Sequence, residues 1–234
     1  MDLQRIDYEA DGRAFAGFLA DGSRGESAPG ILVIHEGGGL GRHTKERAAR
    51  LAELGHVAFA MDLFGLAEFD LERAKAIVQE LRADVPRFRT LCKTALQVLV
   101  DHPHVDGSRL AAIGYCFGGA AAIELARTGA TLAAAVGFHA GILPGTAEDN
   151  RAIRAKILLC HGADDPVVPA AQIQAFAADA GEAGLDWQLH LYGGVGHSFT
   201  NRDIDAWNLP GFRYHEEADR RSWAAMLGLF DEIF

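Results

Sequence analysis

The sequence Ile113-Gly114-Tyr115-Cys116-Phe117-Gly118-Gly119 decides the fold. It follows a short apolar run and opens an alanine-rich segment, and it has the small-x-nucleophile-x-small spacing of a nucleophile elbow, with cysteine at the centre. Because so sharp a strand-to-helix turn is crowded by neighbouring backbone, we expect only glycine at positions 114 and 118 to leave enough room. The helix that follows would point its amino terminus at Cys116, which favours the thiolate form. The alternative is a buried structural cysteine at a tight turn.

Around this turn, short apolar runs alternate with segments of helical periodicity. Apolar runs of this kind are typical of strands covered by helices on both faces, so the chain predicts a doubly wound, mostly parallel α/β sheet. An antiparallel hairpin of residues 3–8 and 13–19 is expected at one edge of the sheet. We expect one domain over residues 1–234. The predicted strands are 31–35, 57–61, 110–114, 132–138, 157–160 and 187–191, and the predicted helices are 45–54, 71–81, 88–99, 118–128, 170–180 and 216–234.

Composition excludes several classes of protein. The 22 Lys and Arg against 32 Asp and Glu give a formal charge of −10, which disfavours binding to nucleic acid or to anionic membranes. No apolar run approaches the roughly 20 residues of a membrane-spanning helix, and the acidic N-terminus does not resemble a signal peptide. Three cysteines do not make a disulfide scaffold. We therefore expect a cytoplasmic protein.

Motifs for cofactors are absent. The loop Glu36-Gly37-Gly38-Gly39-Leu40-Gly41 departs from the dinucleotide-binding G-x-G-x-x-G spacing, which would require glycine where Arg42 stands. There is no phosphate-binding loop, H-E-x-x-H or C-x-x-C motif. We find no paired ligand spacing among the ten histidines, so neither a cofactor nor a metal is expected.

A nucleophile requires a base, and the base requires an orienting carboxylate. Asp164 and Asp165 follow the predicted strand 157–160, and we favour Asp165 because it directly precedes Pro166-Val167-Val168-Pro169, although Asp164 stays open. His197 lies in a glycine loop after the last predicted strand. A solvated loop histidine is the alternative for His197 alone, but the ordered trio Cys116, Asp165 and His197, each just past a strand, indicates a catalytic triad.

The loop after the first parallel strand completes the predicted site. In this architecture an oxyanion is held by two backbone N–H groups, which here would belong to Gly37 and Phe117. Glu36 stands beside them, and a carboxylate near a thiol disfavours the thiolate. We therefore interpret Glu36 as a modulator of the nucleophile, with a solvated loop glutamate as the alternative.

These residues resemble the dienelactone hydrolases, also called carboxymethylenebutenolidases. The resemblance rests on His35-Glu36-Gly37-Gly38, on Gly114-Tyr115-Cys116-Phe117-Gly118-Gly119, on Asp165 and on Gly196-His197-Ser198-Phe199. It implies a monomeric α/β-hydrolase that opens enol lactones through a Cys-His-Asp triad. It also implies that the glutamate holds the resting cysteine until substrate displaces it.

Substrate contacts are less defined by the sequence. Members of the family that act on dienelactone carry an arginine four residues after the histidine, where this chain has Asn201, with Arg202 one step beyond. They also use an arginine from the segment before the elbow, where this chain has Arg73, Arg82, Arg87 and Arg89. We take Arg82, Tyr115, Ser198 and Asn201 as candidate contacts.

Two segments are expected to enclose the pocket. They are residues 62–89, with Leu63, Phe64, Leu66 and Phe69, and residues 207–214; surface loops are the alternative for both. We expect a hydrolase of activated esters or lactones that acts through a thioester on a small-molecule substrate, as a monomer or weak homodimer. The alternatives are a broad carboxylesterase acting on xenobiotic or aryl esters and a non-catalytic, ligand-binding or redox pseudo-hydrolase.

Overall fold

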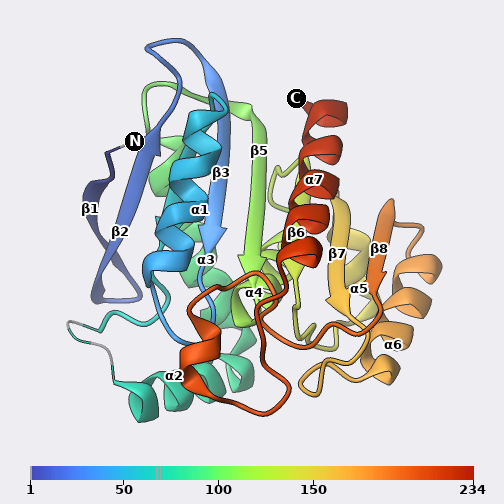
Figure 1. Cartoon of the computed structure of the whole chain (residues 1–234). Coiled ribbons are helices and arrows are strands. Elements are labelled where there is room, and N and C mark those ends of the chain that lie inside the picture. Colours follow the sequence, from blue (N-terminus) through green and yellow to red (C-terminus); the bar gives the residue numbers. More distant parts are fainter. Residues whose placement is uncertain (1, 67, 69) are drawn as a thin grey trace.

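An eight-stranded sheet runs through the computed structural model, which describes residues 2–66, 68 and 70–234 (Figure 1). The strand order is β1-β2-β4-β3-β5-β6-β7-β8, and every pairing from β4 to β8 is parallel. The first two strands form the antiparallel hairpin predicted at one edge. The strands are β1 (Gln4–Ala10), β2 (Arg13–Asp21), β3 (Ala28–Ile34), β4 (Val57–Met61), β5 (Val105–Tyr115), β6 (Ala134–Phe138), β7 (Lys156–Gly162) and β8 (Trp187–Tyr192).

Helices cover both faces of the sheet, as predicted. Helices α1 (Arg42–Glu53) and α7 (Glu216–Ile233) bury apolar side chains against one face and lie in front of the sheet in Figure 1. Helices α2 (Leu71–Ala83), α3 (Val85–Val100), α4 (Phe117–Arg127) and α6 (Ala170–Glu182) contribute to the core on the other face. None of the described helices is long and apolar enough to cross a membrane.

Two short helices were not predicted. Helix α5 (Ala147–Ala152) has only six residues and begins with a capping box in which Thr146 and Asp149 exchange hydrogen bonds. The 3-10 helix η1 (Ile204–Trp207) spans four residues. Both are too short to show an apolar period, because a helical stripe becomes visible only over several turns.

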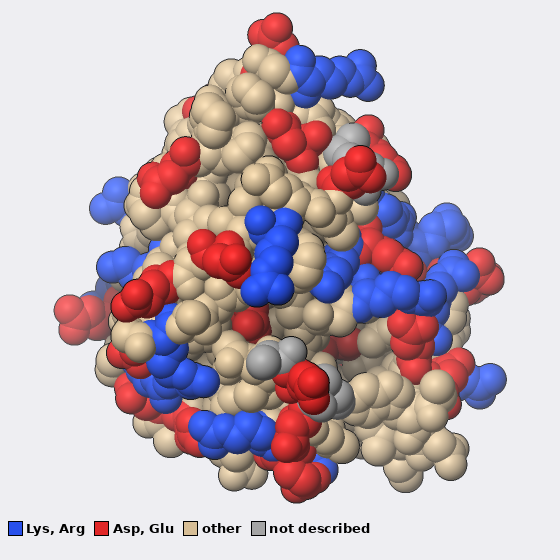
Figure 2. Space-filling view, turned by 90° about the vertical axis from the view of Figure 1, so that its left-hand side faces the viewer, with Lys and Arg blue, Asp and Glu red and all other residues tan. Residues whose placement is uncertain are grey.

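The β1–β2 hairpin forms an outer side of the molecule. Arg5, Asp7 and Glu9 of β1 are exposed, while Ile6 and Tyr8 between them pack against the core. Positive and negative side chains are interspersed over this side, and neither sign forms a continuous field (Figure 2). Its outer strand therefore alternates between charged, solvated residues and residues that anchor it.

The turn between β5 and α4 has the crowding predicted from its glycines. A Cβ atom on Gly114 would overlap the carbonyl oxygen of Gly118, and one on Gly118 would overlap the carbonyl oxygen of Ile34 in β3. These obstacles are backbone atoms, which cannot rotate away as a side chain can. Glycine at both positions therefore lets β5, α4 and β3 meet at the distance that the elbow requires.

Gly114→Ala should lower the free energy of unfolding by about 3 kcal/mol, since an added methyl would force packed backbone apart. Gly228→Ala is the matched control, because Gly228 lies on the exposed side of α7 with no atom near its would-be Cβ. This change should raise stability by about 0.5–1 kcal/mol. Urea unfolding of both variants measures the difference, and equal stabilities would contradict the crowding argument.

Candidate active site

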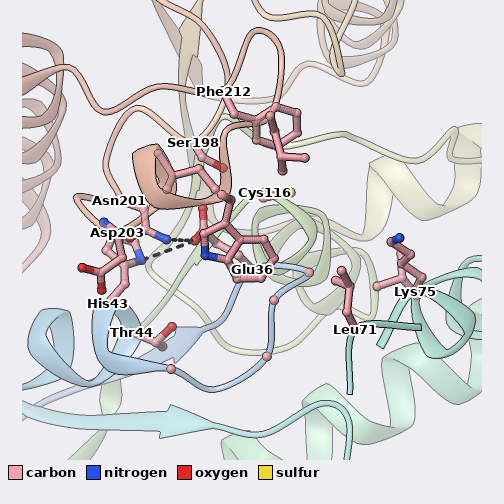
Figure 3. Close-up of a pocket in the computed structure, with 18 of the residues that line it drawn as sticks. Glu36, His43, Thr44, Leu71, Lys75, Cys116, Ser198, Asn201, Asp203 and Phe212 are labelled. Carbon is pink, nitrogen blue, oxygen red and sulfur yellow. Dashed lines mark hydrogen bonds and ion pairs between the residues drawn. The ribbon is translucent and has the colours of Figure 1, made fainter. Parts of the chain in front are cut away.

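Loops that follow β3, β5, β7 and β8 converge at the carboxyl ends of these strands, where ligands bind in open parallel sheets. They contribute, with α2 and the segment around η1, to the walls of a cavity of about 610 Å³. Glu36, Cys116 and Ser198 point into this space from three different loops (Figure 3). The topology thus brings Glu36 and Ser198 together although they are 162 positions apart in the chain.

Cys116 occupies the elbow itself. Its φ of 52° places a non-glycine residue in the left-handed region, between the end of β5 and the start of α4. Such backbone is strained and persists only when its surroundings hold it. Here the N–H of Cys116 donates to the carbonyl oxygen of Phe138 in β6 at 2.9 Å. The half-buried side chain of Cys116 lines the cavity, whereas Cys92 and Cys160 are buried elsewhere.

His197 and Asp165 form a fully buried pair. Nδ1 of His197 lies 2.7 Å from Oδ2 of Asp165. The other carboxylate oxygen accepts the N–H groups of Val167 and Val168 at 2.8 and 3.1 Å, so the carboxylate is fixed in place. Asp164 is exposed and does not contact the histidine ring. Of the two adjacent aspartates, the structure therefore brings Asp165 to His197.

The free edge of the His197 ring is available to Cys116. Within the described chain Nε2 of His197 makes no hydrogen bond of standard geometry. Burial opposes charge on the ring, but the neighbouring Cys116 sulfur and the hydrogen bond to Asp165 outweigh it and raise the pKa of His197 to about 10. A ring with this pKa is positively charged at neutral pH.

Glu36 is held by the loop after β8. Its Oε2 accepts a hydrogen bond from Nδ2 of Asn201 at 2.6 Å and lies 3.9 Å from Nδ1 of His43 (Figure 3). Burial raises the pKa of the Glu36 carboxyl, and hydrogen bonds from Asn201 and Ser198 offset part of this effect. No hydrogen bond joins Glu36 to Cys116 in the described chain. The direct contact that the family resemblance implies for the resting state is therefore not present in this structure.

A network of buried polar side chains behind Glu36 was missed by the sequence analysis. Oγ1 of Thr200 lies 2.9 Å from Nε2 of His139 and 3.3 Å from Nε2 of His43. Nε of Arg47 donates to the same His43 nitrogen, which leaves the Nδ1 hydrogen of His43 directed toward Glu36. Burial lowers the pKa of both histidines well below the usual value, so their rings are neutral. His139 directly follows β6, and its place at a carboxyl strand end was the one signal available in the sequence.

The two predicted oxyanion donors are positioned without competing partners. Within the described chain neither the Gly37 N–H nor the Phe117 N–H donates to a backbone carbonyl. The Phe117 ring is buried and stacks on Phe88 with centroids 4.8 Å apart and planes nearly parallel, which fixes the first turn of α4 beside the cavity. Both N–H groups are therefore available to a ligand oxygen.

One of the four candidate arginines reaches the cavity. Arg82 lines it and lies 5.9 Å from the centre of the Phe117 ring. Among the described residues Arg82 makes no ion pair. The other three do: Arg73 pairs with Glu80, Arg87 with Asp11, and Arg89 with Glu124.

Among the remaining predicted contacts, Ser198 and Asn201 line the cavity. Tyr115 does not, and its predicted substrate contact is wrong. It is fully buried on the sheet face covered by α1 and α7, where its ring stacks on Phe138 with centroids 4.8 Å apart. The reason is the alternation of side chains along β5, which turns Tyr115 away from the elbow.

Both predicted segments contribute to the cavity walls. Leu71 and Val78 of α2 form one side, and Trp207, Leu209 and Phe212 form the other. Three apolar residues of the first segment were wrongly expected to enclose the cavity.

Leu63 and Phe64 are buried in the core instead. Leu66 lines a neighbouring hollow rather than this cavity. Phe69 lies outside the described residues.

The sheet order, the elbow and the converging loops define the α/β-hydrolase fold. The model of the dienelactone hydrolase family matches residues 15–234, and the chain belongs to this family. It is 26% identical over 215 residues to a probable 2-oxo-3-(5-oxofuran-2-ylidene)propanoate lactonase from Bradyrhizobium sp., with 86% of each chain covered.

Two solved structures are more similar. One is a dienelactone hydrolase-like promiscuous phosphotriesterase, P91, from metagenomic libraries; the identity is 41%, the TM-score is 0.95, and the match covers 100% of this chain and 98% of the other. The second is named m3DLH, with 44% identity, the same coverage and a TM-score of 0.95. Both likenesses extend over the whole fold.

The charge on His197 gives a prediction. In the wild-type protein, NMR titration of the ring should show a positively charged imidazolium at neutral pH that loses its proton near pH 10. Cys116→Ala removes the strongest influence that raises this pKa, which should fall toward the ordinary value of about 6.5. Cys92→Ala, at a buried thiol in α3, is the control and should leave the titration unchanged. A wild-type ring that titrates near pH 6.5 would contradict the charged pair.

Proposed function

We propose that this chain is a cysteine hydrolase of activated esters and lactones, with Cys116 as nucleophile, His197 as base and acid, and Asp165 as the group that orients His197. The observation that supports this most directly is the buried His197–Asp165 hydrogen bond, beside an elbow cysteine that raises the pKa of the histidine. Nucleophile, base and orienting acid are then in their usual relation.

The reaction proceeds by acyl transfer to water. The Cys116 sulfur attacks the carbonyl carbon, and the N–H groups of Gly37 and Phe117 stabilise the oxyanion that forms. The carbon–oxygen bond to the leaving group breaks, the imidazolium of His197 gives that oxygen its proton, and a thioester remains. The neutral ring then removes a proton from water, which attacks the thioester. The acid is released, and the sulfur returns as a thiolate paired with the imidazolium.

The choice of sulfur limits the substrate class. A thiolate is itself a good leaving group, so an alkyl alkoxide competes poorly with it in the tetrahedral intermediate. Enolates and phenolates compete better because they are more stable anions. Activated esters and enol lactones should therefore react faster than alkyl esters and amides.

The cavity favours a small substrate with an apolar body and one negative group. Its walls contain Leu71, Val78, Trp207 and Phe212, while Arg82 offers a positive charge without an ion-pair partner among the described residues. A lactone that bears a carboxylate fits both features, and the lactonase named among the relatives supports this class. The modulating role of Glu36 stays a prediction.

The similarity to the phosphotriesterase supports a second candidate activity. The same sulfur would attack phosphorus and displace the aryl oxygen, which takes its proton from His197. Water, activated by the neutral ring, would then break the sulfur–phosphorus bond and release the phosphodiester. Rates on 4-nitrophenyl acetate, an enol lactone and an aryl phosphotriester separate a lactonase from a broad carboxylesterase and from this activity. A pseudo-hydrolase would turn over none of the three.

Cys116→Ala should lower kcat on 4-nitrophenyl acetate by about 10⁴-fold, since the loss of one triad member removes the covalent route. Rapid mixing of the wild type should show a burst of up to one equivalent of 4-nitrophenol, and mass spectrometry after an acid quench should find an acetyl group on Cys116. Cys160→Ala, at a buried cysteine outside the cavity, is the control and should retain the burst. An acylated residue other than Cys116 would overturn the assignment.

Arg82→Gln should raise KM by about 10-fold for 4-nitrophenyl hydrogen succinate, which carries a carboxylate, because a charged hydrogen bond of about 1.5 kcal/mol is lost. KM for neutral 4-nitrophenyl butyrate should hardly change. Arg73→Gln, at an exposed arginine of the same helix that pairs with Glu80, is the matched control. Equal effects on both substrates would argue against Arg82 as the carboxylate contact.

A further inference from the structure

A second cluster of chemistry-bearing side chains lies at the end of the sheet opposite the candidate active site. Asp21 is the last residue of β2, and His102 and His104 directly precede β5. Because β2 runs antiparallel to its neighbour β4, its last residue lies where the parallel strands begin, in the upper part of Figure 1. The cavity with Cys116 lies at the other ends of these strands.

The cluster has the dimensions of a metal site. Oδ2 of Asp21 lies 2.9 Å from Nδ1 of His104 and 3.9 Å from Nε2 of His102, and the three ligand atoms all lie within 4.8 Å of one another. A tetrahedral zinc ion with ligands at 2.0–2.1 Å places its ligand atoms about 3.3 Å apart. Small side-chain rotations therefore bring all three atoms into its coordination sphere.

The backbone under these side chains is fixed. The N–H of Ala28 in β3 donates to the carbonyl oxygen of His104 at 2.8 Å, and the N–H of Val105 donates to that of His102 at 3.0 Å. Oδ1 of Asp21 accepts the N–H of Ser23 at 2.8 Å, which leaves Oδ2 directed at the two imidazoles. Because the fold already holds the three side chains close together, metal binding would cost little further conformational entropy.

The site is also open to an ion. The side chains of Asp21, His102 and His104 retain between 19% and 35% of their exposure. The Ser23 hydroxyl lies 3.0 Å from Nδ1 of His104, where it or a water molecule could supply the fourth ligand. Two imidazole nitrogens and one carboxylate oxygen are a donor set that suits zinc and the neighbouring divalent ions, not magnesium or calcium.

We propose that Asp21, His102 and His104 bind a divalent transition-metal ion, with zinc as the best match. Among the described residues this is the only group of three or more histidine, cysteine, aspartate or glutamate side chains with such spacing. A bound ion would link the end of β2 to the start of β5, so we expect it to stabilise the folded chain and to take no part in ester hydrolysis. The expectation of no metal from the sequence overlooked the His102-Pro103-His104 spacing.

The test measures zinc binding by isothermal titration calorimetry after dialysis against a chelator. It uses the Cys116→Ala protein, so that the elbow thiolate cannot bind the ion. We expect one equivalent of zinc and a higher unfolding temperature on saturation. His104→Ala should weaken zinc binding by roughly 100-fold, since the loss of a direct ligand costs at least as much as the loss of its supporting contacts. His190→Ala, at a partly buried histidine of β8, is the matched control and should bind zinc as before.

Cobalt(II) gives a second readout, because the visible spectrum of the bound ion should indicate nitrogen and oxygen ligands without a sulfur charge-transfer band. His102→Gln serves as a milder variant if His104→Ala does not fold, since the His102 ring has only weak polar contacts. With Cys116 present, either folded variant should hydrolyse 4-nitrophenyl acetate at the rate of its parent. Failure to bind zinc at 100 μM, or equal affinity in His104→Ala and His190→Ala, would overturn the proposal.

Discussion

The close approach of three backbone segments at the elbow is the constraint on which the site depends. Gly114 and Gly118 let the end of β5 and the start of α4 touch each other and the end of β3. Cys116 has its left-handed backbone at this contact, and the start of α4 lies against the end of β3, directly before the loop that holds Glu36 and Gly37. The proposed nucleophile and both predicted oxyanion donors therefore depend on one packing contact.

Burial disfavours the charged form of two ionisable groups near this contact, but the net pKa shifts have different results. At Glu36 burial raises the pKa of the carboxyl, and hydrogen bonds from Asn201 and Ser198 offset only part of this rise. At His197 burial opposes the charge as well, but Cys116 and Asp165 more than offset it. The outcomes differ because Cys116 and Asp165 together outweigh burial at His197, whereas burial is the largest influence at Glu36 and outweighs its hydrogen bonds and the nearby charge of His197. A positively charged imidazole thus lies near a carboxyl group whose pKa is raised.

Local patterns in the sequence were enough to predict the strands, most helices and the elbow, because each depends on a short run of neighbouring residues. The sequence favoured Asp165 over Asp164 but left both open. The loop conformation determines which of two adjacent side chains faces His197, and the sequence does not show that conformation. Tyr115 was misassigned although strand alternation turns it away from Cys116.

Contacts that join distant segments were out of reach. The Thr200 bridge between two histidines depends on how two loops and the first turn of α1 meet. The approach of Asp21 to His102 and His104 depends on the antiparallel course of β2.

The hairpin at the start of the chain has a consequence for the behaviour of the protein at high concentration. An outermost strand offers unpaired N–H and C=O groups to any other strand, and this is a common route to aggregation. In β1 three of the four exposed positions carry a charge, at Arg5, Asp7 and Glu9, and the fourth is Gln4. A second molecule that added a strand at this edge would have to desolvate these charged side chains and place its own side chains beside them. The outer strand therefore opposes the addition of a further strand at this edge of the sheet.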